Sequence, residues 1–199
     1  LGDQPRLALA LGYLAHAYIE LFNVPEALAS GQRALVLAEE IGDTVLTVNA
    51  QNYLLAVNFT LGEYERAIEF GRVVARVSDE IFAEGLDRGF LPLIPWFLVP
   101  PCAEVGRFDE ALSVGETLMR RAETATHPFT IVGMCIGMGY TYMRRGDAGQ
   151  AVPYLERSLR LCRTYDLDNW VPWTASTLGL AYALAGRHSE GIESVQQAV

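Results

Sequence analysis

The side chains able to do chemistry are few, and they are scattered along the chain. A zinc site or a catalytic site needs several His, Cys, Asp or Glu side chains brought together. The histidines and cysteines are His16, Cys102, His127, Cys135, Cys162 and His188. They form no CxxC pair, so we predict neither a metal site nor a cofactor.

Catalytic motifs are also absent from the sequence. The chain contains no lysine, which excludes a phosphate-binding loop of the GxxxxGK type, and it has no GxSxG nucleophile motif. The adjacent carboxylates Glu39-Glu40 and Asp79-Glu80 fall near the ends of predicted helices, where a solvated helix face explains them. We therefore predict no catalytic residue and no enzymatic activity.

Composition limits the partners and the compartment. The net charge is −9 and every cation is an arginine, so no basic surface for nucleic acid is expected. The longest apolar stretch, residues 89–103, is interrupted by four prolines, so no membrane span is predicted. An odd number of separated cysteines favours buried free thiols in a reducing compartment, which predicts a cytoplasmic protein.

A small residue recurs along the chain with a period of about 40 residues. The spacings are 40, 44, 40 and 40 residues between Ala27, Ala67, Ala111, Ala151 and Gly191. Twelve residues before each of these lies a second recurring position, preceded every time by an apolar residue. The second positions are Ala15, Leu55, Val99, Gly139 and Gly179. This self-similarity predicts five repeat units at about 5–41, 45–82, 86–124, 129–165 and 170–199.

Each half of a unit has the apolar periodicity of an amphipathic helix. The predicted helices are 5–21, 25–41, 45–61, 64–82, 90–105, 108–124, 129–145, 148–165, 170–185 and 188–199. Glycine follows the first helix of four units, at Gly62, Gly106, Gly146 and Gly186, where a left-handed residue ends the helix. In the first unit Phe22 occupies this position, and we expect Asn23 to take the left-handed conformation instead.

Four prolines crowd the first helix of the third unit. Pro100 and Pro101 fall in the middle of the predicted helix 90–105, where they should remove two backbone donors and kink it. A recognition feature or hinge and a tolerated packing irregularity are both compatible with this pattern.

The repeating sequence resembles the tetratricopeptide repeat, a helix-turn-helix unit of about 34 residues that contains LGxxY and AxxxF motifs. "MGYTY" (138–142) and "LGLAY" (178–182) match its first helix, and Ala27, Ala67, Ala111 and Ala151 match the family's Ala where the two helices cross closely. The resemblance covers the whole chain and implies an all-α fold, a right-handed α-α superhelix or solenoid. The period of 40 or 44 residues is longer than the family's, and the family's Trp and late Pro are mostly missing.

Longer units of this kind resemble the C-terminal repeat arrays of bacterial signalling proteins that join a class III adenylate/guanylate cyclase to an AAA ATPase. The segments "RRGDAGQAVPYLERSLRLCR" and "ASTLGLAYALAGR" carry this similarity. It implies a regulatory module within a larger signalling protein. We accordingly expect the chain, as a single solenoid domain, to be an excised piece of that protein.

The resemblance also implies where a ligand would bind. In the family, four positions on the first helix of each unit line a concave groove, and on this sequence they contain no Arg, Asp or Glu. An apolar protein or peptide segment would suit such a groove, with side-chain amides bonding the segment's backbone. The candidate groove residues are Asn49, Asn52, Phe59, Trp96, Tyr140, Met143, Trp173 and Ser176.

Four of these residues have two positions compatible with the sequence. Trp96 and Trp173 can line the groove or belong to the core, because long helices bury many of their aromatic residues. Asn49 and Asn52 can face the groove or make hydrogen bonds between helices, since a buried amide needs partners.

Three functions are compatible with the sequence. The first is a non-catalytic interaction module that binds a segment of another protein or of its own parent chain. The second is a homodimeric scaffold that brings attached cyclase or ATPase domains together, and it predicts exposed apolar patches on outer helices or ends. The third is a sensor for a small apolar ligand, which predicts an enclosed pocket.

Overall fold

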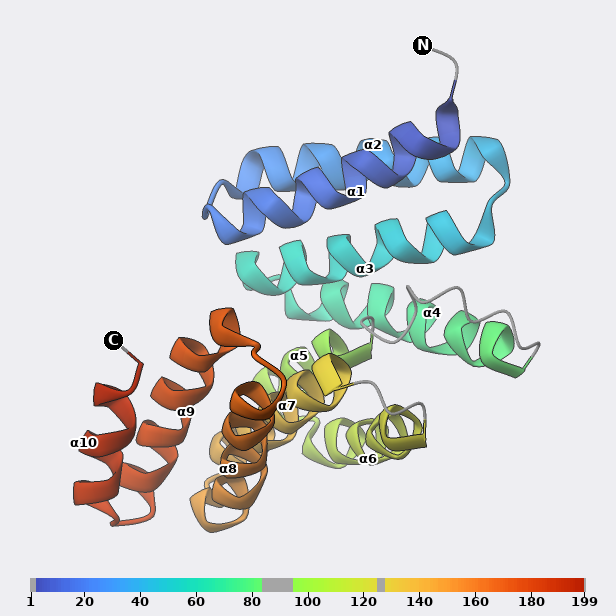
Figure 1. The fold of residues 1–199 in the computed structure, drawn as a ribbon. Helices are drawn as coiled ribbons and strands as arrows, with labels where there is room; N and C mark the ends of the chain where they lie inside the picture. The colour runs from blue at the N-terminus through green and yellow to red at the C-terminus, as the bar shows by residue number, and fades with distance from the viewer. Residues whose placement is uncertain (1–2, 84–94, 125–127, 199) are drawn as a thin grey trace. The chain divides into compact units, whose positions relative to one another are not determined.

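The computed structural model describes the backbone of residues 3–83, 95–124 and 128–198, with all of their side chains except those of 78–83 and 95–96. Within these residues the secondary structure is entirely helical (Figure 1). By its contacts the chain divides into two compact halves, Leu1–Pro101 and Cys102–Val199, which we call the N-terminal half and the C-terminal half. The all-α repeat fold predicted from the sequence is confirmed.

The N-terminal half contains two helical hairpins. They are formed by α1 (Gln4–Glu20), α2 (Val24–Ile41), α3 (Thr44–Leu61) and α4 (Tyr64–Ala83), followed by the 3-10 helix η2 (Pro95–Leu98). Helix α3 packs against α1, α2 and α4, and it is buried on several sides for this reason. A short helix α5 (Val99–Glu104) crosses from this half into the next.

The C-terminal half continues the same helix-turn-helix pattern. Its helices are α6 (Phe108–Thr124), α7 (Pro128–Arg145), α8 (Ala148–Thr164), the 3-10 helix η3 (Asp168–Trp170), α9 (Val171–Leu184) and α10 (His188–Gln196). Each helix packs on the next along the chain, and α7 also contacts α9. Local signals mark the starts: Asp147, before α8, accepts a hydrogen bond from the amide of Gln150.

Small residues at the predicted crossing positions allow the helices to approach closely. Ala27, Ala67, Ala111 and Ala151 are completely buried. At the last crossing a Cβ atom added to Gly179 would lie only 2.9 Å from the carbonyl oxygen of Gly191, one helix away. Larger side chains would push these helices apart.

The turns agree with the sequence in four units and differ in the first. Gly62, Gly106, Gly146 and Gly186 all have positive φ, between 76° and 88°. In the first unit Phe22 itself is left-handed, with φ 56°, whereas Asn23 has φ −91°. The expectation for Asn23 was therefore wrong. The amide of Asn23 instead bonds the carbonyl of Tyr18, so the turn keeps the geometry of its glycine equivalents around the residue that replaces glycine.

The prolines of the third unit also behave differently from the expectation. The continuous α-helix predicted for 90–105 is replaced over residues 95–104 by η2 and α5, and its residues 90–94 lie outside the described part. Because α5 begins at Val99, Pro100 and Pro101 occupy its first turn rather than its middle. Amides of a first turn lack helical partners, so neither proline removes a hydrogen bond there.

Candidate binding surfaces

The exposed face of α9 is the clearest binding surface in the C-terminal half. Trp173, Ser176, Leu180 and Ala183 follow one another at helical spacing and are all exposed, with Trp173 at 46% and Leu180 at 54%. We call these four residues the α9 stripe. A helix face with two large apolar side chains in solvent is suited to contact an apolar partner.

Trp173 is held in place by other aromatic rings. Its ring stacks on that of Trp170 at a centroid distance of 5.4 Å, and Trp170 in turn meets Phe129 edge to face at 4.8 Å. Trp170 is buried, so one face of the Trp173 ring packs on a fixed partner while nearly half of Trp173 stays accessible. A ring fixed in this way loses little conformational entropy when it binds a partner.

A charged group lies beside the predicted residues of α7. The carboxylate of Glu104 on α5 accepts hydrogen bonds from the hydroxyl of Tyr140 and from Arg144 Nη2, the latter at 2.7 Å. The Glu104 side chain is only 9% exposed and that of Arg144 is 50% exposed. No pattern in the sequence pointed to Glu104, because it lies 36 and 40 residues before its partners.

The predicted residues of the N-terminal half are less accessible. Asn49 and Asn52 are buried, at 8% and 5% exposure. Asn49 lies beneath Gly12 of α1, where a Cβ atom would approach its Oδ1 to 3.1 Å. The Oδ1 atom of Asn52 has no hydrogen-bond partner among the described residues, which is unusual for a buried amide.

The remaining predicted residues have varied positions. Phe59 is half-buried, with its ring 5.9 Å from that of Tyr64. Tyr140 and Met143 are half-buried on α7. Trp96 has its backbone in η2, but its side chain lies outside the described residues.

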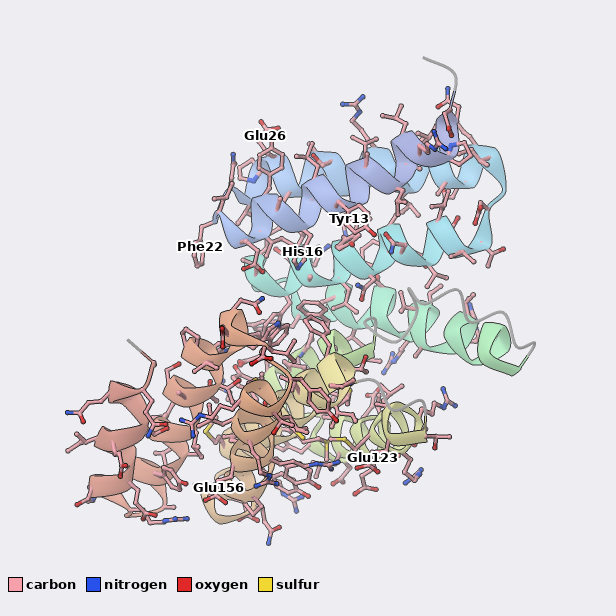
Figure 2. The ribbon with its side chains drawn as sticks, in the orientation of Figure 1. Tyr13, His16, Phe22, Glu26, Glu123 and Glu156 are labelled. Atoms are coloured by element: carbon pink, nitrogen blue, oxygen red, sulfur yellow. The ribbon has the colours of Figure 1, made fainter. Side chains whose placement is uncertain are left out.

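His16 of α1 lies beside Tyr53 of α3. Burial, with the nearby Tyr13 as a second cause, raises the pKa of Tyr53 to about 12, so this phenol is neutral at physiological pH. The ring of His16 lies 5.8 Å from the Tyr53 ring, and its Nε2 atom is 3.7 Å from a carboxylate oxygen of Glu20 (Figure 2 labels His16). His16 and Glu20 are one helical turn apart, yet the described residues contain no group of three side chains able to hold a metal.

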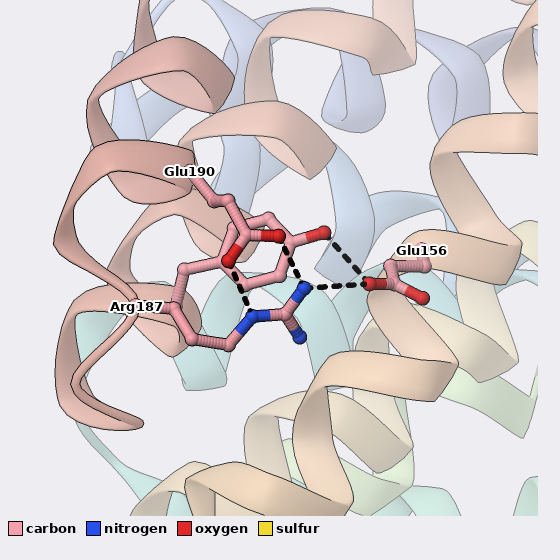
Figure 3. Close-up of polar contacts among 4 residues, drawn as sticks. Glu156, Arg187 and Glu190 are labelled. Carbon is pink, nitrogen blue, oxygen red and sulfur yellow. Dashed lines mark hydrogen bonds and ion pairs between the residues drawn. The ribbon is translucent and has the colours of Figure 1, made fainter.

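In the C-terminal half, a polar network joins α8, α9 and α10 (Figure 3). The hydroxyl of Tyr182 on α9 donates to Glu156 of α8 at 2.7 Å. Arg187 lies over the Tyr182 ring, 4.3 Å from its centroid, and donates through two nitrogens to Glu190 of α10. An open groove of about 560 Å³ runs beside the network between α8, α9 and α10. Because its charges largely pair with one another, we assign the network a structural role.

The three cysteines lie buried as free thiols, as the sequence predicted. Burial raises the pKa of the Cys135 thiol to about 12, so it is not a reactive thiolate at neutral pH. None of the helices that the structure describes is long and apolar enough to cross a membrane.

Comparison with known proteins supports the family that the sequence resembles. Residues 134–199 match the model of the tetratricopeptide repeat family. No curated protein sequence matches the chain.

Solved structures with the same fold cover nearly the whole chain. BtubC from P. vanneervenii has 19% identity over 98% of this chain and 84% of its own, with a TM-score of 0.69. A thermophilic TPR protein from Thermus thermophilus has 19% identity over 96% of this chain and 89% of its own, with a TM-score of 0.69. A Rap protein crystallised with Competence and Sporulation Factor has a TM-score of 0.81 at 12% identity. The alignment covers 94% of this chain and 52% of the Rap chain.

Proposed function

We propose, from the support for the tetratricopeptide repeat family, that this chain binds an apolar segment of a protein along the α9 stripe. Repeats of this family typically mediate protein-protein interaction, and they are generally non-catalytic. The observation that carries the proposal is the exposed Trp173 ring, stacked on a buried partner and aligned with exposed Leu180. Aromatic side chains anchored in this way are common centres of binding energy in interfaces.

An extended segment fits this surface better than a small apolar molecule. Trp173 and Leu180 are about half exposed, so they lie on an open face rather than in an enclosed pocket. Ser176 lies between them, but its hydroxyl already donates to the carbonyl of Trp173 at 2.9 Å, which leaves its oxygen as an acceptor for a backbone amide. The surface therefore offers apolar contacts on both sides of one polar contact.

The experiment is a selection of randomised peptides displayed on phage against the wild-type chain, followed by affinity measurement of the enriched peptides. We expect enriched sequences to carry aromatic or aliphatic anchors, and we expect Trp173→Ala to weaken their binding by more than about tenfold. Ile192→Ala on α10 is the matched control, because Ile192 is an exposed apolar residue outside the stripe. Equal binding by wild type and Trp173→Ala would contradict the proposal.

In the N-terminal half we propose that a bound segment reaches the unpartnered Oδ1 atom of Asn52, which requires the side chains that cover this buried atom to move aside. An unpartnered buried acceptor costs free energy, so Asn52→Leu should leave the free energy of unfolding unchanged or increase it. Binding of a peptide to this half should nevertheless weaken in the variant. If stability rises and peptide affinity is unchanged, Asn52 has no role in binding.

We further propose that the chain acts in the cytoplasm as the regulatory part of a larger signalling protein. The support is the sequence similarity to cyclase and ATPase arrays and the presence of three buried free thiols. The bound segment then belongs either to another protein or to the parent chain itself. Measuring the cyclase or ATPase activity of a parent protein carrying Trp173→Ala tests this, and an unchanged activity under all conditions would contradict it.

A further inference from the structure

Phe22 is a residue that the fold itself does not explain. It has a left-handed backbone at the turn where four other repeats have glycine, and an L-residue with a Cβ atom is disfavoured there by about 1 kcal/mol or more. Its side chain is 84% exposed and that of the preceding Leu21 is 73% exposed. Figure 2 shows Phe22 projecting from the α1–α2 turn away from the helices. The residue therefore strains the backbone without gaining contacts inside the chain.

The same helical hairpin contains an apolar groove that nothing in the described part of the chain covers. The groove lies between α1 and α2, has a volume of about 480 Å³, and is lined chiefly by Leu7, Leu11, Ala29, Arg33, Val36 and Leu37. Its volume lies in the range of about 300–1,000 Å³ that is typical of ligand sites. Leu7 and Val36 on its rim are 46% and 54% exposed. Two large side chains such as Phe22 and Leu21 match its apolar lining.

One charge in the groove, that of Arg33, is opposite in sign to the carboxylates that flank the turn. The turn is flanked by the carboxylates Glu20 and Glu26, and residues 13–32 contain no arginine. The groove contains Arg33, which has no ion-pair partner among the described residues. Glu40 also lies at the far end of the groove, so the attraction is local to the part around Arg33.

The turn and the groove of one molecule do not contact each other. The groove extends from Ala29 to the end of α2, away from the turn, and the high exposure of Phe22 excludes its insertion there. We propose that Phe22 and Leu21 of one copy insert into the α1–α2 groove of a second copy. Two different patches then meet, and in a head-to-tail arrangement the copies at the two ends keep a free turn and a free groove, so association continues.

The test measures mass by light scattering from dilute to concentrated protein. We expect the wild-type mass to rise with concentration past that of a dimer. Phe22→Gly should abolish this rise without lowering the unfolding temperature, because glycine suits the left-handed turn. Val36→Arg should abolish it by placing a charge in the groove, whereas Gln150→Arg, which adds the same charge at an exposed position on α8, should not.

A mixture of two variants provides the sharpest result. Phe22→Gly retains the groove and Val36→Arg retains the turn, so together they should form a one-to-one heterodimer that grows no further. Unspecific association of exposed apolar surfaces would not depend on Phe22. A monomeric wild type at every concentration, or association that survives Phe22→Gly, overturns the inference. Neither outcome affects peptide binding by the α9 stripe, which lies in the C-terminal half.

Discussion

The effect of a single residue in this protein depends on how closely its helix approaches a neighbour. Gly179 and Gly149 are both helical glycines, but only Gly179 lies where two helix backbones nearly touch. Helix propensity favours alanine over glycine by about 1 kcal/mol in a helix interior, where Gly179 lies, and by less in the first turn of α8, where Gly149 lies. Packing opposes alanine only at Gly179, where a Cβ would also lie 2.5 Å from a methyl group of Val195.

This contrast predicts opposite effects for the same substitution. Gly179→Ala should lower the free energy of unfolding by about 1–3 kcal/mol, because α9 and α10 must separate to admit the methyl group. Gly149→Ala should leave it unchanged or raise it by up to about 1 kcal/mol, since the nearest atom to its Cβ would be 3.9 Å away. Urea unfolding followed by circular dichroism measures both variants, and equal destabilisation by the two would show that packing is not the cause.

At the scale of helices, α8 contains an internal proline. Pro153 lies in the second turn of α8, and its side chain is exposed. A proline inside a helix lacks the amide that bonds the carbonyl four residues earlier, and its ring crowds that carbonyl. Pro100 and Pro101 escape this cost because they lie in a first turn.

Replacing this proline should therefore stabilise the protein. We expect Pro153→Ala to raise the free energy of unfolding by about 1–3 kcal/mol, since a helical hydrogen bond becomes possible and no core contact is lost. Pro100→Ala is the matched comparison and should change it by less. Urea unfolding compares the two variants, and a larger gain from Pro100→Ala would contradict the observed start of α5 at Val99.

Because of the network between α8, α9 and α10, the free energy of unfolding should change with pH in the alkaline range. Burial, and next the hydrogen bond to Glu156, raise the pKa of Tyr182 to about 12 from its ordinary 10.0. The folded state thus retains a proton that the unfolded state releases earlier. Neutral Tyr182 contributes its full stabilisation below pH 10, and the contribution is lost as the pH rises toward 12.

Tyr182→Phe separates this contribution from that of other groups. The variant should be less stable at neutral pH by about 0.5–1.5 kcal/mol, the value of a typical hydrogen bond. Its stability should fall less steeply above pH 10 than that of the wild type. Tyr53 and Cys135 titrate in both proteins, so the difference between the two urea-unfolding profiles belongs to Tyr182. Parallel profiles would exclude the assigned pKa shift.

For the whole molecule, stability follows from contacts between neighbouring helices along the chain. Helices α3 and α7 each pack against three other helices and have the longest sets of buried residues among the described helices. Helix α10 packs on α9, and few of its residues are buried. In repeat folds of this kind, each helix is only as stable as the neighbours that cover it.

Hydrogen exchange should therefore vary along the chain. We expect the slowest amide exchange in α3 and α7 and the fastest helical exchange in α10, because few residues of α10 are buried and its local opening exposes little apolar surface. Mass spectrometry of peptides from each helix measures this order. Uniform protection across α3, α7 and α10 would mean that the halves unfold as single units.

Much of this architecture was determined by the sequence alone. The helix ranges predicted from apolar periodicity agree with most observed helices to within one or two residues, because a helix depends on residues three and four apart. The glycine turns of four units and the small crossing residues were also predicted, since a left-handed turn favours glycine and a close helix crossing requires a small side chain. These are local properties, which a periodic sequence repeats five times.

Tertiary structure alone decided which of the predicted binding residues are accessible. Trp170 is buried and Trp173 is exposed, although they lie on the same short stretch of sequence. Asn52 is buried without a partner for its oxygen among the described residues, and Glu104 meets Tyr140 from 36 residues away. Accessibility and charge pairing depend on contacts between repeats. Such contacts are set by how whole helices pack, and no local pattern in the sequence encodes them.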